Sequence, residues 1–496
     1  MKKVFSKLEK HHLIFAAILF LTFLLRFPSL FEPFWYGDEG IFAAVARNLN
    51  QGGVLYQTAW DNKPPMIYLT YQAIFKLFGV SMFWLHLVAA IVVLATAAIV
   101  YEIAQEVIGE KRALVATAVF GILTSLRLIE GNLALTEIFM ILPISLAMMI
   151  AVKRKFDYKS LVVAGALFAI ASLYKQVGAL EAAALGLFLF FQSRNFLEFI
   201  KKGVVLSFGF FIPYAVTVGY FYPKHLVGDY IFAAYTYYRI YLNESPQYAA
   251  IINIAKYLPV IAAVLYGLYK KIRFKKVELW HLFLLWMAFS FLGSYFSGRT
   301  YGHYLVQATP ATALLAASFS KTRLKINRAR IIFALSFFLP LMFLTRLIFA
   351  DFITGGPINQ MRYWNNFIGF AAGRESAGSY NDRFDRNVNT IMAVSDFLAA
   401  KKAYGESVYI WGDIPWLYAI ANSHNPSRYV TSFHVFGVPN GKEEVTTALN
   451  NKPPLYIIKP QSSIGYFEGL EKLISSEYTF VAKINGAEIY ARESGK

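Results

Sequence analysis

Long apolar blocks alternate with short polar segments over the first 350 residues of the chain. The longest blocks come close to the ~20 residues that a helix needs to cross the hydrocarbon core of a bilayer. They are residues 13–31, 83–103, 134–152, 203–222, 278–296 and 331–350. Further blocks, several of them short, are residues 113–126, 160–173, 177–192, 250–268 and 303–319. The pattern therefore predicts about eleven membrane-spanning helices.

Lys175 and Arg26 are among the basic residues that lie within apolar stretches. Lys175 sits near the middle of residues 160–192, which are too many for one span. Two short helices that meet at this polar turn keep the ammonium out of hydrocarbon, so the pattern predicts a helical hairpin. Arg26, near the end of the first block, is interpreted as a snorkelling residue whose charge reaches the membrane surface.

A long segment, residues 32–82, separates the first two predicted spans. Within it, GDEGIFAAVARNLNQGG (37–53) has helical apolar spacing and ends in a Gly pair that suits a helix C-terminus. MIYLTYQAIFKLFG (66–79) is aromatic and amphipathic, so we expect it to lie along the membrane surface. Asp38 and Glu39 fall in the first turn of the earlier helix, where acidic side chains are favoured for capping alone.

The pattern changes after residue 350, where the long apolar blocks stop. Short strands are predicted at SVYIWG, RYVTS, PLYIIK and YTFVAKI, and helices near residues 387–402, 441–449 and 465–474. This alternation predicts a small α/β domain. We therefore expect an all-α polytopic membrane domain over residues 1–350 and a C-terminal α/β domain over residues 351–496.

Composition and charge narrow the class. Hydrophobic residues make up 57% of the chain and the mean hydropathy is +0.45, an apolar load that a soluble domain would have to expose. The chain has no cysteine, which excludes disulfides and thiolate metal sites.

A net charge of +18 suits either nucleic acid or an anionic membrane, and its distribution decides. Basic residues concentrate in alternate inter-span segments, above all residues 153–159, 270–276 and 321–330. The positive-inside rule places these segments and the N-terminus in the cytoplasm, without any nucleic acid partner. An odd number of spans then makes the C-terminal domain extracytoplasmic, and we expect a multi-pass protein of the plasma membrane.

The residues suited to chemistry gather in the segments predicted to lie outside. FWYGDEG (34–40), WDNKPP (60–65) and SGRTYGHYLVQATP (297–310) carry most of them. The candidates are Asp38, Glu39, Asp61, Lys63, Glu137, Lys175, Arg239, Arg299, His303 and Tyr304, and Glu130 lies in the same outer turns without an assigned role. Each alone is equally well read as a solvated loop residue, but charged groups that converge at one membrane face indicate function. Lys, Arg and His or Tyr donors bind anions well, and phosphate is the expected one.

Over residues 10–320 the chain resembles the C-type (GT-C) integral-membrane glycosyltransferases. The similarity is to the bacterial branch with protein O-mannosyltransferases and lipid A aminoarabinose transferases. It rests on GDEG opening the first outer loop, DNKPP about twenty residues later, LALTEIF, LYKQVG and GHYLVQATPATALLAA. Several relatives have Glu or His near the KPP motif where this chain has Asp61, Asn62 and Lys63.

The resemblance implies an enzyme that uses a polyprenyl-phosphate-linked sugar as donor. It makes Asp38 the general base. Glu39 is the second catalytic candidate, and it either holds the acceptor or forms a salt bridge at the start of the helix. The resemblance also places Lys63, Arg299, His303 and Tyr304 near the donor phosphate, and we expect Lys175 to add a further cation there. Asp61, Glu137 and Arg239 are candidate substrate-binding residues, and it stays open whether Asp61 binds the acceptor, the donor or a structural partner. The acceptor is a lipid, a protein or a glycan. No cofactor is implied, and a divalent metal on the carboxylate pair is not favoured because Lys63 is expected nearby.

Two other functions compete with transfer. A lipid or polysaccharide transporter predicts inverted repeats and polar residues at mid-membrane, and neither is evident in the sequence. An envelope assembly subunit would use residues 351–496 for binding but leaves the acid and cation motifs of the first 310 residues without a role. Release of polyprenyl phosphate from a lipid-linked sugar separates transfer from both.

Overall fold

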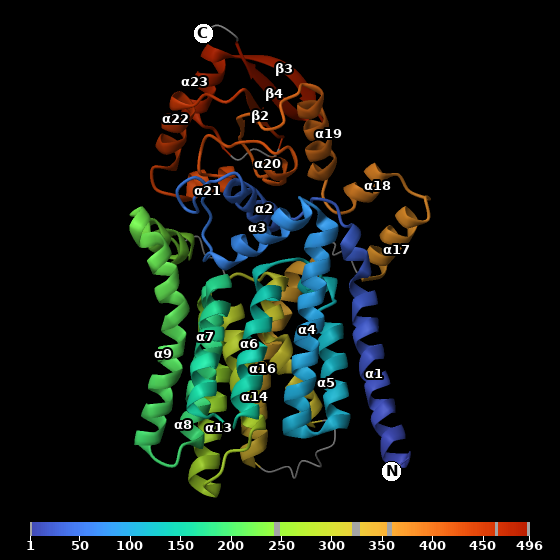
Figure 1. Ribbon diagram of the computed structural model, residues 1–496, viewed down its shortest axis with the longest axis vertical. Coiled ribbons are helices and arrows are strands. Elements are labelled where there is room, and N and C mark those ends of the chain that lie inside the picture. Colours follow the sequence, from blue (N-terminus) through green and yellow to red (C-terminus); the bar gives the residue numbers. More distant parts are fainter. Residues whose placement is uncertain (1, 243–248, 320–327, 355–359, 462–464, 494–496) are drawn as a thin grey trace. The chain divides into compact units, whose positions relative to one another are not determined.

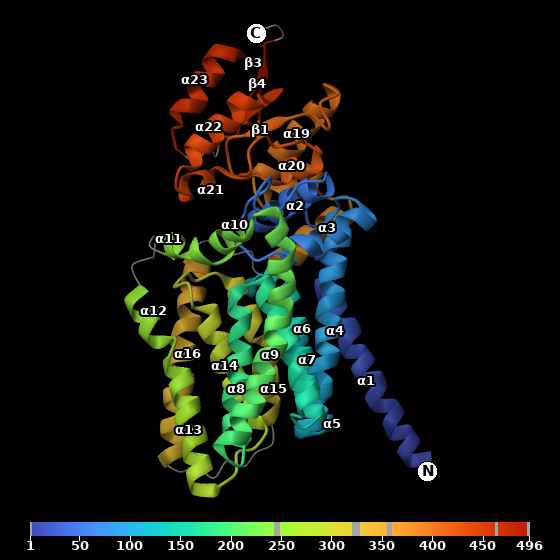
Figure 2. The same ribbon diagram turned by 60° about the vertical axis from the view of Figure 1, so that its left-hand side comes forward.

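The computed structural model describes residues 2–242, 249–319, 328–354, 360–461 and 465–493. The chain divides into two compact units, each built from separate stretches of sequence. Unit 1 comprises residues 1–29, 86–220 and 244–362, and unit 2 comprises residues 30–85, 221–243 and 363–496. Figures 1 and 2 draw both units, and each is described by itself below.

Unit 1 is a bundle of helices. Its long elements are α1 (Lys2–Arg26), α4 (Met82–Ile108), α5 (Glu110–Leu123), α6 (Thr136–Lys153), α7 (Tyr158–Tyr174), α8 (Leu180–Gln192), α9 (Phe196–Phe221), α12 (Ala249–Ala255), α13 (Leu258–Phe274), α14 (Trp280–Ser294), α15 (Thr309–Phe319) and α16 (Arg328–Thr354). Short helical turns are η2 (Arg127–Ile129), η3 (Gln176–Ala179) and η6 (Gly302–Ala308). The last residue of α9 and the first residues of α4 belong to unit 2. Figure 2 shows α13 packed along α16.

Each apolar block of the sequence coincides with helix in this unit. Within the described residues, 5 helices are long and apolar enough to cross a membrane: those over residues 10–31, 82–108, 136–153, 196–224 and 250–274. Shorter apolar helices cover residues 158–174, 176–192, 280–294 and 331–347. These helices indicate a multi-pass membrane protein, whereas the count of about eleven spans stays a prediction.

The helical hairpin predicted around Lys175 is confirmed. α7 begins after Asp157, whose side chain accepts a 2.7 Å hydrogen bond from the Ser160 N–H as an N-cap. It ends at Tyr174, because Lys175 takes an extended conformation with φ −155° and ψ 130°. The turn η3 then leads into α8.

The snorkelling interpretation of Arg26 is wrong. Its side chain is fully buried, and one guanidinium nitrogen, Nη1, donates 2.7 Å hydrogen bonds to the carbonyls of Thr124 and Gly131. These carbonyls belong to the connection between α5 and α6, where backbone groups lack helical partners. Arg26 therefore stays inside because it satisfies the backbone of a buried turn.

Unit 2 combines short helices with a small sheet. Its helices are α2 (Gly37–Asn50), α3 (Met66–Phe78), α10 (Val227–Ile231), α11 (Tyr238–Leu242), α18 (Ala377–Asp382), α19 (Asn387–Ala400), α20 (Trp416–Ile420), α21 (Ser432–Gly437), α22 (Gly441–Asn451) and α23 (Glu468–Glu477), with most of α17 (Gln360–Ala371) and the turns η4 (Tyr222–Lys224) and η5 (Phe232–Thr236). The short helix η1 (Phe27–Phe31) contains the point in the sequence, after Ser29, where unit 1 ends and unit 2 begins. The strands β1 (Val408–Ile410), β2 (Tyr456–Lys459), β3 (Tyr478–Ile484) and β4 (Ala487–Arg492) form one sheet in the order β1-β2-β4-β3. β1 is parallel to β2, and the other pairs are antiparallel.

The strand predictions are partly right. β1, β2 and β3 fall within predicted strands, and β4 was missed. The sequence signal for β4 is the Asn485–Gly486 pair, which precedes it. The positive φ angles of these residues, 46° and 87°, make the tight turn between β3 and β4. The strand predicted at residues 428–432 is wrong, because only Tyr429 forms an isolated bridge and Thr431 then caps α21.

The loop over residues 32–82 and the C-terminal segment share one core in unit 2. Trp60 is fully buried, with its ring centroid 5.0 Å from that of Tyr237, 5.7 Å from Tyr429 and 5.1 Å from His434. Residues 30–85 are thus grouped with residues 363–496 rather than with the bundle. The domain boundary expected at residue 350 stays a prediction.

Candidate functional site

The acidic pair opens helix α2. Tyr36, in an extended conformation, precedes the first residue, and Asp38 and Glu39 lie in the first turn, where the exposed N–H groups favour negative charge. Asp38 is half-buried, whereas Glu39 is fully buried. A β-carbon on Gly40 would come within 2.8 Å of Trp416, so glycine is what lets α20 pack against this turn. Trp416 is a core residue, and its indole N–H donates to the Tyr36 carbonyl at 3.0 Å.

One face of α2 packs on the aromatic face of α3. Phe42 lies one helical turn after Asp38, so both side chains occupy the same face. The Phe42 ring centroid is 6.0 Å from that of Tyr68 and 5.6 Å from that of Tyr71. Burial and the negative charges of Glu39 and Asp38 raise the pKa of the Tyr71 phenol well above its usual value. Asp38 therefore lies close enough to α3 to act electrostatically on its buried tyrosines.

Asp61 is the centre of a buried polar group that we call the first-loop cluster: Asp61, Lys63, Tyr68 and His434. The Tyr68 hydroxyl donates to Asp61 Oδ2 at 2.7 Å. The Lys63 Nζ lies 3.6 Å from the same oxygen, and the His434 Nε2 lies 3.2 Å from Oδ1. The carboxylate itself has no solvent exposure. A buried charge of this kind persists only when it is paired and hydrogen-bonded, as it is here.

The partners decide the ionisation of Asp61. Burial by itself raises the pKa of the carboxyl, because it disfavours the charged form. The positive charge of Lys63 and the donors His434 and Tyr68 outweigh burial and hold the pKa of Asp61 well below its usual value. Asp61 is therefore an anion at neutral pH.

Lys63 is held in place along its whole length. Its carbonyl accepts a 2.7 Å hydrogen bond from the Tyr56 hydroxyl, and its N–H donates to the Tyr68 hydroxyl at 3.2 Å. Its ammonium donates to Asn62 Oδ1 at 3.2 Å and lies 5.2 Å from the centroid of the Phe42 ring. Because Phe42 shares a helix face with Asp38, the structure brings the predicted base and the predicted phosphate ligand to one face of α2.

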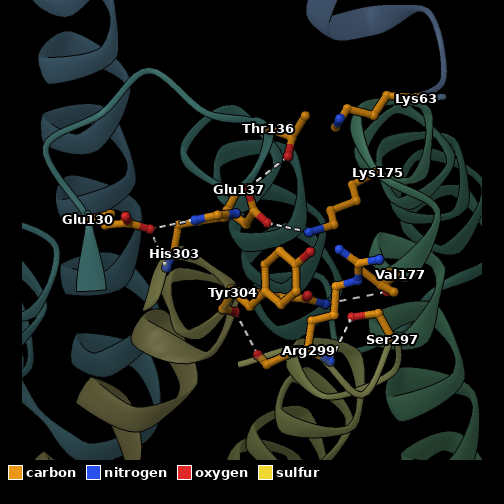
Figure 3. A network of polar contacts seen from close by, with 12 residues as sticks. Lys63, Glu130, Thr136, Glu137, Lys175, Val177, Ser297, Arg299, His303 and Tyr304 are labelled. Atoms are coloured by element: carbon orange, nitrogen blue, oxygen red, sulfur yellow. Dashed lines mark hydrogen bonds and ion pairs between the residues drawn. The ribbon is translucent and has the colours of Figure 1, made fainter. Parts of the chain in front are cut away.

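A second polar group lies in unit 1, and we call it the bundle cluster: Glu130, Glu137, Lys175, His303 and Tyr304 (Figure 3). Glu137, in the first turn of α6, is buried and forms an ion pair with Lys175 from the end of α7. The Thr136 hydroxyl donates to the other Glu137 oxygen at 2.7 Å. The Lys175 ammonium lies 3.6 Å from the centroid of the Tyr304 ring, a cation–π contact.

His303 joins the bundle cluster through Glu130. Its Nδ1 lies 2.6 Å from Glu130 Oε2, and its backbone N–H donates to the same oxygen at 3.3 Å. Although burial raises the pKa of Glu130, the hydrogen bonds and charge of His303 lower it overall. The sequence placed Glu130 in an outer turn but gave it no role; its role is set by a turn distant in sequence.

A buried carboxylate fixes η6, which carries His303 and Tyr304. Gln307, also on η6, donates to Glu181 Oε1 at 2.7 Å and to the Val177 carbonyl at 3.3 Å. The Ser290 hydroxyl donates to the same Glu181 oxygen at 2.8 Å. Glu181 has no solvent exposure. It therefore ties η6 to α8 and α14 from within the bundle.

The remaining predicted residues lie on other elements or are closed off from solvent. Arg299 lies on the connection between α14 and η6, is half-buried, and its backbone N–H donates to the Ser297 hydroxyl at 3.4 Å. Arg239 is exposed on α11 in unit 2, and the structure, where it describes side chains, does not bring it into the first-loop cluster. Asp61 and Glu39 are fully buried, which argues against the direct substrate contacts expected of them.

His434 and Tyr68 are the cluster members that the sequence did not identify. The sequence placed Tyr68 in an amphipathic helix and gave it no further role. In the structure it is one of the buried residues of α3. His434 follows a segment read as a strand, and no local motif marks it. The signal for both lies in their contact with Asp61, which only the fold brings about.

Known proteins resemble this chain in sequence and in fold. The sequence model of the family described as dolichyl-phosphate-mannose-protein mannosyltransferase matches residues 62–218. An uncharacterized protein from Aquifex aeolicus (strain VF5) is 23% identical over 338 residues, which cover 64% of this chain and 66% of the relative. The matched part is thus slightly less than two thirds of that relative's length.

Solved structures extend the likeness to nearly the whole chain. ArnT from Cupriavidus metallidurans bound to undecaprenyl phosphate superposes with a TM-score of 0.57 at 15% identity, covering 97% of this chain and 98% of ArnT. The apo state of the same protein gives a TM-score of 0.57 at 15% identity, covering 96% and 97%. The chain therefore has the fold of ArnT, and the resemblance predicted from its sequence motifs is confirmed.

Proposed function

We propose, from this resemblance, that the protein is a membrane glycosyltransferase whose donor is a sugar linked to polyprenyl phosphate. The acceptor would receive the sugar on the outer face of the membrane. The family match over residues 62–218 and the fold of ArnT support a lipid-linked sugar transfer. The acceptor is a lipid, a protein or a glycan, and the assay compares these three classes.

The observation that carries the proposal is that Asp38 and the Lys63 ammonium both lie toward the face of α2 that carries Phe42. Lys63 lies against Phe42, one turn from Asp38, and is held there by backbone and side-chain hydrogen bonds. A carboxylate able to take a proton and a cation able to hold a phosphate are the groups that such a transfer requires. Both lie on elements of the same compact unit.

In the proposed reaction, a hydroxyl oxygen of the acceptor attacks the anomeric carbon of the donor sugar. The bond between that carbon and the phosphate oxygen breaks, and its electron pair leaves with the polyprenyl phosphate. The hydroxyl proton passes to the Asp38 carboxylate, which acts as general base. A single displacement of this kind inverts the configuration at the anomeric carbon. Glu39, buried beside Asp38, is assigned to holding the start of α2 rather than the acceptor.

The cations are assigned to the donor phosphate. Lys63, Lys175, Arg299 and His303, with the Tyr304 hydroxyl, would neutralise the charge that grows on the leaving phosphate, so no metal is required. Carboxylates accompany these cations: Asp61 lies beside Lys63, Glu137 beside Lys175 and Glu130 beside His303. In this proposal the carboxylates hold the cations ready, which lowers the ordering cost when the donor binds.

The test is transfer by purified, detergent-solubilised protein given undecaprenyl phosphate that carries a radiolabelled sugar, together with a lipid, protein or glycan acceptor. Chromatography follows the label, and mass spectrometry follows released undecaprenyl phosphate. We expect the wild-type protein to release the lipid phosphate and Asp38→Asn to lose this activity by at least ~100-fold, because a general base contributes about 10²–10⁴-fold.

The matched control is Asp396→Asn, an exposed carboxylate on α19 of the same unit. It should retain wild-type transfer, and both variants should elute alike in size-exclusion chromatography. An active Asp38→Asn protein would rule out Asp38 as the base. Absence of release from the wild-type protein with a panel of sugars and acceptors would favour a transporter or an assembly subunit.

A further inference from the structure

His434 reaches the first-loop cluster from a segment far along the chain. It lies on α21 and is only 2% exposed, so its ring is isolated from solvent. Its Nε2 is 3.2 Å from Asp61 Oδ1, and its Nδ1 is 3.0 Å from the Thr431 hydroxyl. The Trp60 ring packs edge-on against the imidazole, with centroids 5.1 Å apart. The ring therefore has one position and a partner for each nitrogen.

The surroundings also fix what each ring nitrogen does. Asp61 is an anion, so the nitrogen that faces it must carry the proton. The Thr431 hydroxyl can donate to the opposite nitrogen while its oxygen caps α21 by accepting from the His434 N–H at 3.4 Å. Thr431 thus selects the tautomer whose Nε2–H points at Asp61.

The two carboxylate oxygens of Asp61 face different partners. Oδ2 accepts from the Tyr68 hydroxyl at 2.7 Å and faces Lys63 at 3.6 Å, while Oδ1 faces His434. Because positive or N–H and O–H groups compete for one carboxylate, the Tyr68 hydrogen bond and the close approach of the His434 Nε2 each weaken the pull on the lysine ammonium. The Lys63 ammonium is thereby oriented without being fully neutralised. A cation in that state can still bind an incoming phosphate.

We propose that His434 is a positioning residue for Lys63 and acts through Asp61 to set the affinity for the lipid-phosphate donor. The inference rests on the proposed function, in which Lys63 binds the donor phosphate. Without the His434 N–H, Oδ1 loses its partner and the carboxylate draws the ammonium more tightly to itself. Binding of the donor phosphate must then compete with that stronger ion pair.

Steady-state kinetics with separate variation of donor and acceptor tests the proposal. His434→Leu removes the donor nitrogen while keeping apolar volume, and His434→Gln keeps an N–H at the position of Nε2. We expect His434→Leu to raise KM for undecaprenyl-phosphate sugar by roughly tenfold, the scale of one buried contact between an imidazole N–H and a carboxylate. The KM for the acceptor and kcat should change little. His434→Gln should restore most of the donor affinity.

The matched control is His424→Leu, an exposed histidine of the same unit, which should leave both KM values unchanged. A purely structural role would lower the amount of active protein, and hence the apparent kcat, without a selective change in donor KM. An unchanged donor KM in His434→Leu, or a loss that Gln does not restore, would overturn the proposal.

A second variant keeps the proposal testable if His434→Leu does not fold. Thr431→Val removes the hydroxyl that selects the tautomer and also caps α21, and it should raise donor KM in the same direction by a smaller factor. A folded Thr431→Val protein with unchanged donor KM would overturn the proposal. Failure of the wild-type protein to use any polyprenyl-phosphate sugar would instead contradict the proposed function.

Discussion

At the scale of single residues, the buried acids of unit 2 show how an ion can be kept inside a protein. Asp61 has no solvent exposure, yet a cation and two polar donors surround its two oxygens. Removing one partner of such a group leaves a charge that water cannot reach, which costs more than the lost contact alone. Asp61 should therefore be sensitive to substitution even though it does not meet solvent.

The lowered pKa of Asp61 makes its contribution to stability depend on pH. The folded-state pKa lies below the ordinary value of 3.8, so the unfolded chain takes up the proton first as pH falls. The stabilisation by the ionised carboxylate is complete at neutral pH and declines below about pH 4. We expect the difference in Tm between wild type and Asp61→Asn to be constant from about pH 6 to 8 and to shrink in acid.

Thermal unfolding of purified protein across this pH range measures the effect. Asp396→Asn, which changes an exposed carboxylate, serves as the control and should show no comparable trend. A difference between wild type and Asp61→Asn that stays constant into strong acid would show that the charge of Asp61 does not stabilise the fold.

Sequence motifs identified the site residues that stand in short, recognisable stretches of the chain. Asp38 and Lys63 stand in short motifs, and the structure brings both to α2. His434 could not be found in this way, because its partner Asp61 lies in the first loop and no periodicity connects them. Burial was also beyond the sequence: Glu39 was read as an active-site acid but is closed off from solvent.

At the scale of elements, two helices of the bundle meet backbone to backbone. A β-carbon on Gly209 of α9 would lie 2.0 Å from the Val162 carbonyl oxygen of α7, and one on Gly165 of α7 would lie 2.1 Å from the Leu206 carbonyl oxygen of α9. Small residues at such crossings let membrane helices approach closely. Gly203, also on α9, faces open space.

This contrast predicts opposite effects of the same substitution in one helix. Gly209→Ala should destabilise the protein by about 1–3 kcal/mol, because the methyl group forces the two backbones apart. Gly203→Ala should be neutral or stabilising by up to about 1 kcal/mol, since Ala is the better helix former. Thermal unfolding in one detergent compares them, and a Gly209→Ala protein as stable as Gly203→Ala would contradict the close approach.

Periodicity located the helices well and the strands less well. Apolar blocks long enough to cross a bilayer leave few alternatives, so every block coincides with a helix. A strand of a few residues has no such constraint, and RYVTS failed because Thr431 caps a helix instead. The Asn485–Gly486 turn was a sufficient signal for β4 that hydrophobic alternation alone did not reveal.

At the scale of the whole molecule, the distribution of basic residues predicts the orientation in the membrane. Cytoplasmic segments are expected to be rich in Lys and Arg, and residues 153–159 and 270–276 are. Because the chain has no cysteine, single cysteines report on topology without background. Lys155 and Lys472 are both exposed and belong to the two predicted sides.

In intact cells, a membrane-impermeant maleimide should label Lys472→Cys but not Lys155→Cys. After permeabilisation, both variants should react, which confirms that each thiol is accessible. Labelling of Lys155→Cys in intact cells would reverse the predicted orientation and place the C-terminal segment in the cytoplasm.

The grouping of the chain into two units was not evident from hydropathy. The first loop is separated from residues 363–496 by most of the bundle in sequence, yet Trp60, Tyr237 and Tyr429 share a core. Hydropathy reports only local composition, so it marks where apolar blocks end but not which polar segments pack together.

The contact between Asp61 and His434 has a consequence for biosynthesis. Ribosomes add residues in order, so Lys63 emerges long before the histidine that completes its surroundings. The nascent chain therefore carries the first-loop cluster without its histidine until residue 434 has been made. Under the proposals above, the site would reach its full donor affinity only after residue 434 has been made, so that an incompletely made protein would bind lipid-linked sugar more weakly.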